Sequence, residues 1–310
     1  MINFIYQILR TARPRQWLKN FALLAPAAIM GNILNPLTIT RLIDGFIAFC
    51  LISSAAYFVN DIIDSPKDAL HPIKKNRPIP SGKIKVWQAW IIAIVLMFLA
   101  INYSLSFGGN FFTALVIVYI LIQFLYSTFI RNIIILDSLT VASGFVIRVI
   151  AGAVITSISV SSWLILTTVA LSLLLAFGKR RSEKTLLSET HTEAETRKTL
   201  KNYPDTLLDS MITMSATFCI VTYSLFTFQV SPDLTVSSIK RYLPSVIESP
   251  KWLMFTIPIV IYGVARYLYV IYEKKQGESP ERALLSDYPL LITVLLWGFL
   301  IFLHNIFIIN

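Results

Sequence analysis

Long apolar runs dominate this chain and restrict its fold more than any other feature. Nine of them are about 17 to 25 residues long, the length that a helix needs to cross a bilayer. Only 14% of the residues are charged, against about 25% in soluble domains. The runs are continuously apolar and lack the in-out alternation of a membrane barrel. We therefore predict an all-α fold, a polytopic membrane helical bundle of about nine transmembrane helices, forming one integral-membrane domain over residues 1–310.

The connections between the predicted spans differ strongly in charge. Of the 27 lysines and arginines, 22 fall on the side that holds the N-terminus. The positive-inside rule then predicts a multi-pass protein of the inner (plasma) membrane, with the N-terminus and the polar clusters cytoplasmic and the C-terminus outside. The predicted spans are approximately Asn20 to Ile39, Leu42 to Asn60, Val86 to Phe107, Asn110 to Ile130, Ile134 to Ile155, Ser161 to Phe177, Ser210 to Val230, Trp252 to Tyr272, and Tyr288 to Ile309.

The net charge of +10 has an explanation that does not involve nucleic acid. Basic loops lie against anionic membrane lipids, and a phosphate-rich substrate also requires cations. We see no soluble module that would bind nucleic acid. No P-loop, dinucleotide fingerprint or serine or cysteine triad can be assembled either. The sequence leaves the oligomeric state open, a homo-oligomer included.

Carboxylates collect abruptly at the end of the second predicted span. Asp61, Asp64 and Asp68 are three and four residues apart, so on a helix they project from one face, with Asn60 one turn before Asp64. Such like charges repel unless a cation sits among them, and Mg²⁺ prefers oxygen ligands together with substrate phosphates. Lys74 and Arg77 follow, as a phosphate-bearing substrate would require. The alternative is a solvated acidic helix end followed by a basic loop at the membrane surface.

Two charged segments are long enough to cover a site. The first is the loop from Asp61 to Lys85, and the second is the loop from Gly178 to Leu208, with an amphipathic helix expected from about Thr192 to Asn202. The second begins with Lys179 and Arg180, which act either as a phosphate clamp or as a simple topological stop.

Arg148 is the most informative single residue outside the aspartate stretch. It lies three or four turns into a predicted span, where a charge costs several kcal/mol unless it faces a polar cavity. We interpret it as a ligand of an anionic substrate, the alternative being a buried ion pair with an aspartate such as Asp137. Lys19, Tyr126 and Arg131 are further candidates at span ends, where aromatic and basic residues are also ordinary interface anchors.

These residues resemble those of the UbiA-type superfamily of membrane prenyltransferases. The likeness to its first aspartate-rich motif lies in Asn60 to Asp64, extended by Asp68, and in the NRPIPSG segment that follows. Within the superfamily, the chain most resembles the decaprenyl-phosphate phosphoribosyltransferase branch over nearly its whole length. The stretches that carry this likeness are RPRQWLKN, SSAAYFVND, DALHPIKKNRPI, SGFVIRVIAG, SSWLIL and GKRRSE.

The resemblance implies a Mg²⁺-dependent transfer of 5-phosphoribosyl from phosphoribosyl pyrophosphate to a polyprenyl phosphate. It implies catalytic and metal-binding roles for Asp61, Asp64 and Asp68. Typical superfamily members carry a second aspartate-rich motif where this chain has Lys179, Arg180 and Arg181, so cations replace most of those carboxylates. The alternatives are a prenyltransferase that moves a polyprenyl group from its diphosphate to an aromatic acceptor, such as a quinone or haem precursor, and a lipid transporter. Clustering of the charges at one face disfavours the transporter.

Overall fold

A computed structural model describes residues 2–71, 74–190, 202–230, 251–274 and 280–309. Every regular element within these ranges is helical, so the predicted all-α class is confirmed. Seven of the described helices are long and apolar enough to cross a membrane. The chain is therefore a multi-pass membrane protein, and nine was an approximate count of its spans.

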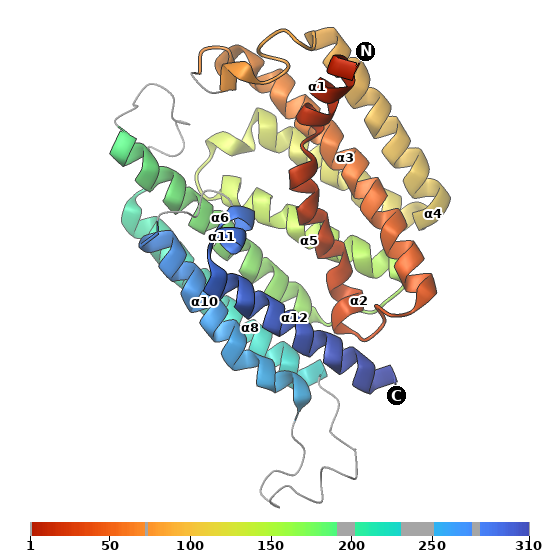
Figure 1. Cartoon of the computed structure of the whole chain (residues 1–310), viewed down its shortest axis with the longest axis vertical. Helices are drawn as coiled ribbons and strands as arrows, with labels where there is room; N and C mark the ends of the chain where they lie inside the picture. Colours follow the sequence, from red (N-terminus) through yellow and green to blue (C-terminus); the bar gives the residue numbers. More distant parts are fainter. Residues whose placement is uncertain (1, 72–73, 191–201, 231–250, 275–279, 310) are drawn as a thin grey trace, which may run out of the picture. The chain divides into compact units, whose positions relative to one another are not determined.

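The chain divides into two compact units, which we describe separately. Within the described part of the chain, the first comprises residues 2–27, 33–71, 74–159 and 202. Its α3, α4 and α5 pack on one another, and η1 contacts α3 and α5 (Figure 1). Its elements are α1 (Ile2–Ala12), the 3-10 helix η1 (Pro14–Leu24), α3 (Pro36–Asp68), η2 (Lys74–Asn76), α4 (Val86–Thr128), η3 (Ile130–Asn132) and α5 (Leu136–Thr156).

The 43-residue helix α4 contains two of the predicted spans. They meet at Gly109, whose φ of 73° and ψ of −179° are not helical. The half before Gly109 places Tyr103 against Asp44, and the half after it places Ser127 against Asn60, near the other end of α3. Because Ala89 and Ala93 also cluster with Phe58, the first half runs antiparallel to α3 and the second runs parallel to it. The chain therefore reverses direction at Gly109, where glycine tolerates a positive φ.

The first predicted span, Asn20 to Ile39, is not one helix. Its residues fall on the end of η1, on the short α2 (Ala25–Ile29) and on the start of α3. Gly31 has a φ of 80°, and Pro36 is at the start of α3, where its missing N–H costs nothing. Apolar length predicted a span here, but the proline and glycine positions determine where each helix begins and ends.

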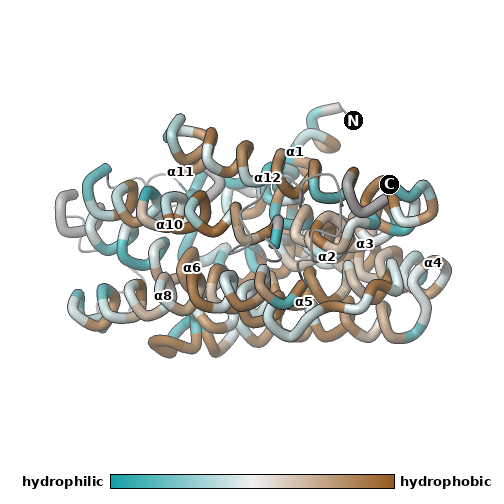
Figure 2. The backbone as a smooth tube through the Cα atoms, turned by 90° about the horizontal axis from the view of Figure 1, so that it is seen from below, coloured by the Kyte–Doolittle hydropathy of each residue, from teal (hydrophilic) through white to brown (hydrophobic). Residues whose placement is uncertain are grey.

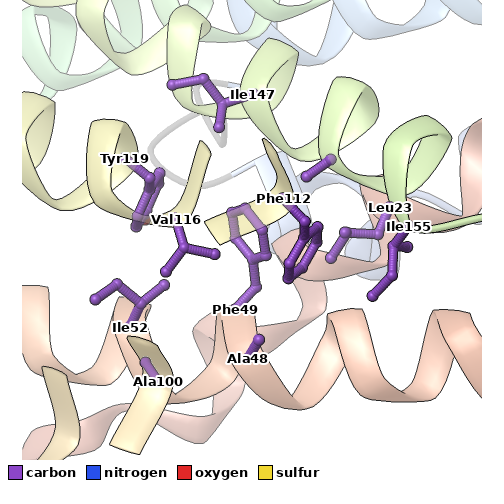
Figure 3. Packing of buried hydrophobic residues seen from close by; sticks show 11 residues of the cluster. Leu23, Ala48, Phe49, Ile52, Ala100, Phe112, Val116, Tyr119, Ile147 and Ile155 are labelled. Carbon is purple, nitrogen blue, oxygen red and sulfur yellow. The ribbon is translucent and has the colours of Figure 1, made fainter. Parts of the chain in front are cut away.

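The core of the first unit is an interlocking set of aromatic and branched side chains. Phe49 of α3 lies between Phe112 and Tyr119 of α4, with ring centroids 6.1 and 5.6 Å from its own (Figure 3). Leu23 of η1 and Ile155 of α5 belong to the same cluster. This core holds the middle of α3, and a second cluster that includes Phe58 and Ile62 packs beside the aspartates.

Gly152 allows α5 to touch the backbone of η1. A Cβ at Gly152 would lie 2.0 Å from the carbonyl oxygen of Leu23. We expect Gly152→Ala to destabilise the protein by at least about 1–3 kcal/mol, because backbone must move to admit the methyl group. Thermal unfolding in detergent measures this. Gly298→Ala is the matched control, since nothing lies within 4 Å of a Cβ there. An equal melting temperature for both variants would contradict the close approach.

Within the described residues, the second unit comprises 28–32, 160–190, 203–230, 251–274 and 280–309. Its helices α8, α10 and α12 lie alongside one another, with brown, hydrophobic residues recurring along each (Figures 1 and 2). A polar chain links α12, α8 and η5, in which the Trp297 indole donates to Tyr223 at 2.7 Å and Tyr223 pairs with Thr256 at 2.6 Å. The elements are α6 (Ser162–Thr190), α8 (Asp205–Val230), η5 (Trp252–Thr256), α10 (Ile257–Tyr272), α11 (Pro280–Ser286) and α12 (Tyr288–Ile309).

The predicted loop from Gly178 to Leu208 needs correction at its start. Helix α6 continues to Thr190, so Lys179 and Arg180 are helical residues. The reason lies in local pairing, because Glu183 is 3.7 Å from Lys179 and 2.7 Å from Arg180, at helical spacings of four and three. The amphipathic helix expected from Thr192 to Asn202 lies outside the described residues but for its last one.

Asp287 anchors the start of α12. Both of its oxygens accept from Arg266 at 2.9 Å, and Lys274 lies 2.7 Å from Oδ2. The carboxylate also caps the helix by accepting from the N–H of Leu290. The hydrogen bonds from Arg266 hold the pKa of Asp287 well below its usual range.

This pairing makes stability depend on pH in a definite direction. The depressed pKa means that the ion pair stabilises the folded state above the unfolded-state pKa of about 3.9, and that this contribution is lost as the pH falls below it. We expect Asp287→Asn to melt at a lower temperature than the wild type at pH 7. The gap should shrink as the pH is lowered below 4 in thermal unfolding scans. A gap that is constant down to the lowest pH of the scans would contradict this role.

Candidate functional site

Helix α3 carries the three predicted aspartates on its last two turns. It continues as a helix through Asp68, so the assumption behind their three- and four-residue spacing is confirmed. Asp61 and Asp68 are 2% and 5% exposed, which is rare for charged side chains. A buried carboxylate needs a cationic partner or a strong hydrogen bond.

Arg77 bridges two of the carboxylates. Its Nη1 lies 2.5 Å from Oδ2 of Asp68 and 3.5 Å from Oδ1 of Asp61. A single cationic nitrogen is therefore in contact with carboxylates that are two helical turns apart. Local hydrogen bonds fix the backbone around Arg77, from Arg77 N to the Lys74 carbonyl at 2.9 Å and from Ser81 N to the Arg77 carbonyl at 3.0 Å.

Asp64 has a different set of partners. Its Oδ1 accepts from Arg131, which η3 holds in a buried position, and its Oδ2 accepts from Asn60 at 3.3 Å. Asn60 is itself oriented by Ser127 of α4, whose hydroxyl donates to the Asn60 Oδ1 at 3.2 Å. The predicted residues Asn60, Asp64 and Arg131 thus form one connected network.

Arg13 belongs to the same cluster, although sequence reasoning did not select it. Its Nη2 lies 2.5 Å from Oδ1 of Asp61, and its guanidinium carbon stands 5.0 Å from the ring centroid of Tyr57. Its φ of 54° is uncommon for a residue other than glycine, and such strain is concentrated at functional sites. The available signal was the dipeptide Arg13–Pro14, because Pro14 breaks the helix between α1 and η1 and leaves Arg13 at the break.

The resulting site is a nearly balanced set of charges. Three carboxylates from α3 face three arginines, namely Arg13, Arg77 and Arg131, that come from separate segments of the first unit. Phosphate oxygens and metal ions are the ligands that such arginines and carboxylates respectively bind.

The residues present fit a hard divalent cation at one point of the cluster. Arg77 Nη1 already lies between Asp61 and Asp68, so a cation at that point is in reach of two carboxylates. Mg²⁺ is usually held by one or two carboxylates with water and phosphate completing its shell. As the side chains lie, no group of three or more His, Cys, Asp or Glu within the described ranges has metal-site geometry. One cation can therefore contact two carboxylates, those of Asp61 and Asp68, while the Asp64 carboxylate is paired with Arg131.

Arg148 lies elsewhere in the first unit and is 5% exposed. Its Nε donates to Asn20, its Nη1 to the Gly144 carbonyl and its Nη2 to the Tyr119 hydroxyl, each at 2.8 Å. Three aromatic rings also lie within 6 Å of its guanidinium, which stabilises a cation through the ring faces. All three nitrogens thus donate to neutral groups, and none of these bonds is the ion pair with Asp137. A buried positive charge remains available to attract an anion.

The other predicted residues are spread over both units. Asp137 is buried at the first turn of α5 and accepts from Ser138 at 3.4 Å, next to Ile135, whose φ is 68°. Lys74 lies in η2, and its N–H donates to His71 at 3.3 Å. Lys19 of η1 and Tyr126 of α4 are half-buried. Lys179 and Arg180 belong to the second unit, where both contact Glu183.

Fold and site together define a multi-pass, all-helical membrane protein with a partly buried aspartate–arginine cluster at the end of a membrane helix. The profile of the UbiA prenyltransferase family matches residues 21–180. The chain belongs to the UbiA prenyltransferase family, as its aspartate motif predicted.

Named relatives match over nearly the full chain. A decaprenyl-phosphate phosphoribosyltransferase from Corynebacterium glutamicum is 32% identical over 96% of this chain and 86% of its own. One from Mycolicibacterium smegmatis is 33% identical, over 95% of this chain and 91% of its own. Among solved structures, a UbiA homolog from Archaeoglobus fulgidus bound to GPP and Mg²⁺ has a TM-score of 0.66 at 18% identity and covers 96% of this chain and 99% of its own. The structural likeness supports the fold.

Proposed function

We propose that this chain transfers a 5-phosphoribosyl group from phosphoribosyl pyrophosphate to a polyprenyl phosphate and releases pyrophosphate, in a Mg²⁺-dependent reaction. The observation that carries the proposal is the cluster of three aspartates and three arginines, in a chain about one-third identical to named phosphoribosyltransferases. Such a cluster suits a substrate that brings several phosphate charges together with a metal ion.

The reaction needs no general base from the protein. An oxygen of the lipid phosphate is already a competent nucleophile, so it forms the new bond to C1 of the ribose. The bond from C1 to the pyrophosphate breaks, and its electron pair leaves with pyrophosphate. The task of the protein is to stabilise the charge that develops on both parts.

Each residue of the cluster has a role in this scheme. Asp61 and Asp68 would hold Mg²⁺, which neutralises the charge of the departing pyrophosphate when it is bound. Arg77 and Arg131 would donate to phosphate oxygens, and we add Arg13 to this group because of its contact with Asp61. Asn60 orients Asp64, and Asp137, a carboxylate outside the metal-binding pair, would face the positive charge that develops on the ribose ring.

The substrates carry phosphate groups besides the pyrophosphate, namely the 5-phosphate of the donor and the phosphate of the lipid, and these also need cations. Arg148 is a buried cation whose bonds are with neutral groups, which supports a role in attracting the 5-phosphate or the lipid phosphate. Lys179 and Arg180 stay candidates for the same task, as do Lys19, Lys74 and Tyr126 for binding substrate. We place the site on the cytoplasmic side of the inner (plasma) membrane, where most of the basic residues are predicted to lie.

A donor-choice assay tests the proposal against ordinary prenyl transfer, which the family name itself favours. The purified protein is offered phosphoribosyl pyrophosphate with polyprenyl phosphate in one reaction, and polyprenyl diphosphate with an aromatic acceptor in another. We expect turnover in the first reaction only. Turnover confined to the second would establish the alternative.

A further inference from the structure

The arginines of the site occupy the same carboxylate oxygens that a metal ion requires. Arg13 and Arg77 both contact Oδ1 of Asp61, and Arg77 also holds Oδ2 of Asp68. Arg131 pairs with Asp64 in the same manner. Each of the three aspartates therefore already has a guanidinium counter-ion.

In the pairs that Arg13 and Arg77 make, the arginine is the more exposed partner. The side chains of Arg13 and Arg77 are 28% and 29% exposed, whereas the paired Asp61 is 2% exposed. Arg13 and Arg77 are thus more accessible to a ligand arriving from solvent than Asp61 and Asp68 are. A flexible guanidinium can turn outward to a phosphate more readily than a buried carboxylate on a packed helix can move.

Charge balance makes the two ligands depend on one another. A metal ion that binds alone at Asp61 and Asp68 must displace Arg77 and leave it without a counter-ion. A pyrophosphate group that binds alone to the arginines leaves two buried carboxylates unpaired, which is costly. When both bind, each arginine exchanges its carboxylate for a phosphate, and each carboxylate exchanges its arginine for the metal.

We infer that Arg77, with Arg13, is an exchangeable counter-ion that makes metal binding at Asp61 and Asp68 conditional on a pyrophosphate-bearing ligand. The inference rests on the proposed function for the identity of the two ligands. It goes beyond that function because it gives the arginines a role in the substrate-free protein, where they keep free divalent ions from the carboxylates. By linkage, metal and pyrophosphate then raise one another's affinity by the same factor.

Metal binding without substrate tests this directly. The full-length protein in detergent is titrated with Mn²⁺ as a stand-in for Mg²⁺, and free Mn²⁺ is counted by electron paramagnetic resonance. We expect Arg77→Gln to bind Mn²⁺ about 10-fold more tightly than the wild type, because its carboxylates no longer carry a competing cation. Lys75→Gln is the matched control, since it removes the same charge from an exposed position in the neighbouring η2 and should change the affinity by less than about 3-fold.

A second titration measures the coupling. Inorganic pyrophosphate is added at fixed concentrations, with its complexation of Mn²⁺ in solution measured separately and subtracted. Pyrophosphate should tighten Mn²⁺ binding to the wild type and have a much smaller effect on Arg77→Gln. An Arg77→Gln protein that binds Mn²⁺ no more tightly than the wild type would overturn the inference, because Arg77 would then be a phosphate ligand or a structural pair only.

A substitute variant and comparison with the transfer assay keep the outcome unambiguous. If Arg77→Gln does not fold, as judged by its melting temperature and elution profile, Arg13→Gln replaces it, since Arg13 holds the same oxygen of Asp61. Neither titration contains phosphoribosyl donor or lipid, so both are independent of the transfer assay. A protein that transfers phosphoribosyl but shows no coupling would contradict this inference alone, and one that shows coupling without transfer would contradict the proposed function alone.

Discussion

Asp61→Asn is expected to abolish phosphoribosyl transfer, by about 100-fold or more, while the protein stays folded. Arg13 and Arg77 both contact the Asp61 carboxylate. Arg77 also contacts Asp68, so a cation at the position of its guanidinium nitrogen is within reach of both carboxylates. The amide keeps the shape of the side chain and removes the charge that a metal needs. Turnover with labelled donor and polyprenyl phosphate measures the loss, beside a thermal unfolding scan.

Asp44→Asn is the matched control for this variant. Asp44 lies on the same helix and accepts a hydrogen bond from Tyr103 at 2.8 Å, away from the cluster. We expect its turnover to be near normal. Near-normal turnover in a folded Asp61→Asn protein would rule out the assignment of Asp61 to the metal.

The second large effect is expected at Arg148. Arg148→Met should lower the melting temperature, because it removes the donor to Asn20, Gly144 and Tyr119, and charged hydrogen bonds contribute about 1.5–3 kcal/mol each. It should also weaken the binding of phosphate-bearing substrate by about 10-fold or more if the buried charge attracts the anion.

Arg148→Lys separates these two contributions. Lysine keeps the charge but cannot make the three directed bonds of the guanidinium. We expect the lysine variant to remain less stable than the wild type and to bind substrate better than the methionine variant, in titrations of the folded fraction. Equal substrate affinity in both variants would show that the charge of Arg148 is not used for binding.

The helical class was predictable because lipid leaves few alternatives to a long apolar helix. The boundaries were less predictable. Two predicted spans are the arms of α4 on either side of Gly109, and the first predicted span is divided by Gly31 and Pro36. Apolar length measures how much chain can sit in lipid, whereas helix ends depend on single glycines and prolines.

The positions of the three aspartates on α3 were predictable from the sequence. The arginines that pair with them from other segments were not. The spacing of Asp61, Asp64 and Asp68 places them together wherever a helix forms, and α3 does extend through all three. Their partners are separated from them by as much as 67 residues, in the case of Arg131 and Asp64. No periodicity relates such pairs, because they are set by how α1, η3 and the turn after η2 fold back onto α3. For Arg148, a neutral set of acceptors replaced the ion pair that sequence alone left open.

The reaction itself is tested most directly by mass spectrometry of the lipid. Purified protein is incubated with phosphoribosyl pyrophosphate, Mg²⁺ and a polyprenyl phosphate, and the lipids are then extracted. The proposed function predicts a new lipid heavier than the acceptor by one phosphoribosyl group, formed together with an equal amount of pyrophosphate and not formed by Asp61→Asn. An unchanged lipid, with active protein demonstrated by turnover of a polyprenyl diphosphate, would contradict it.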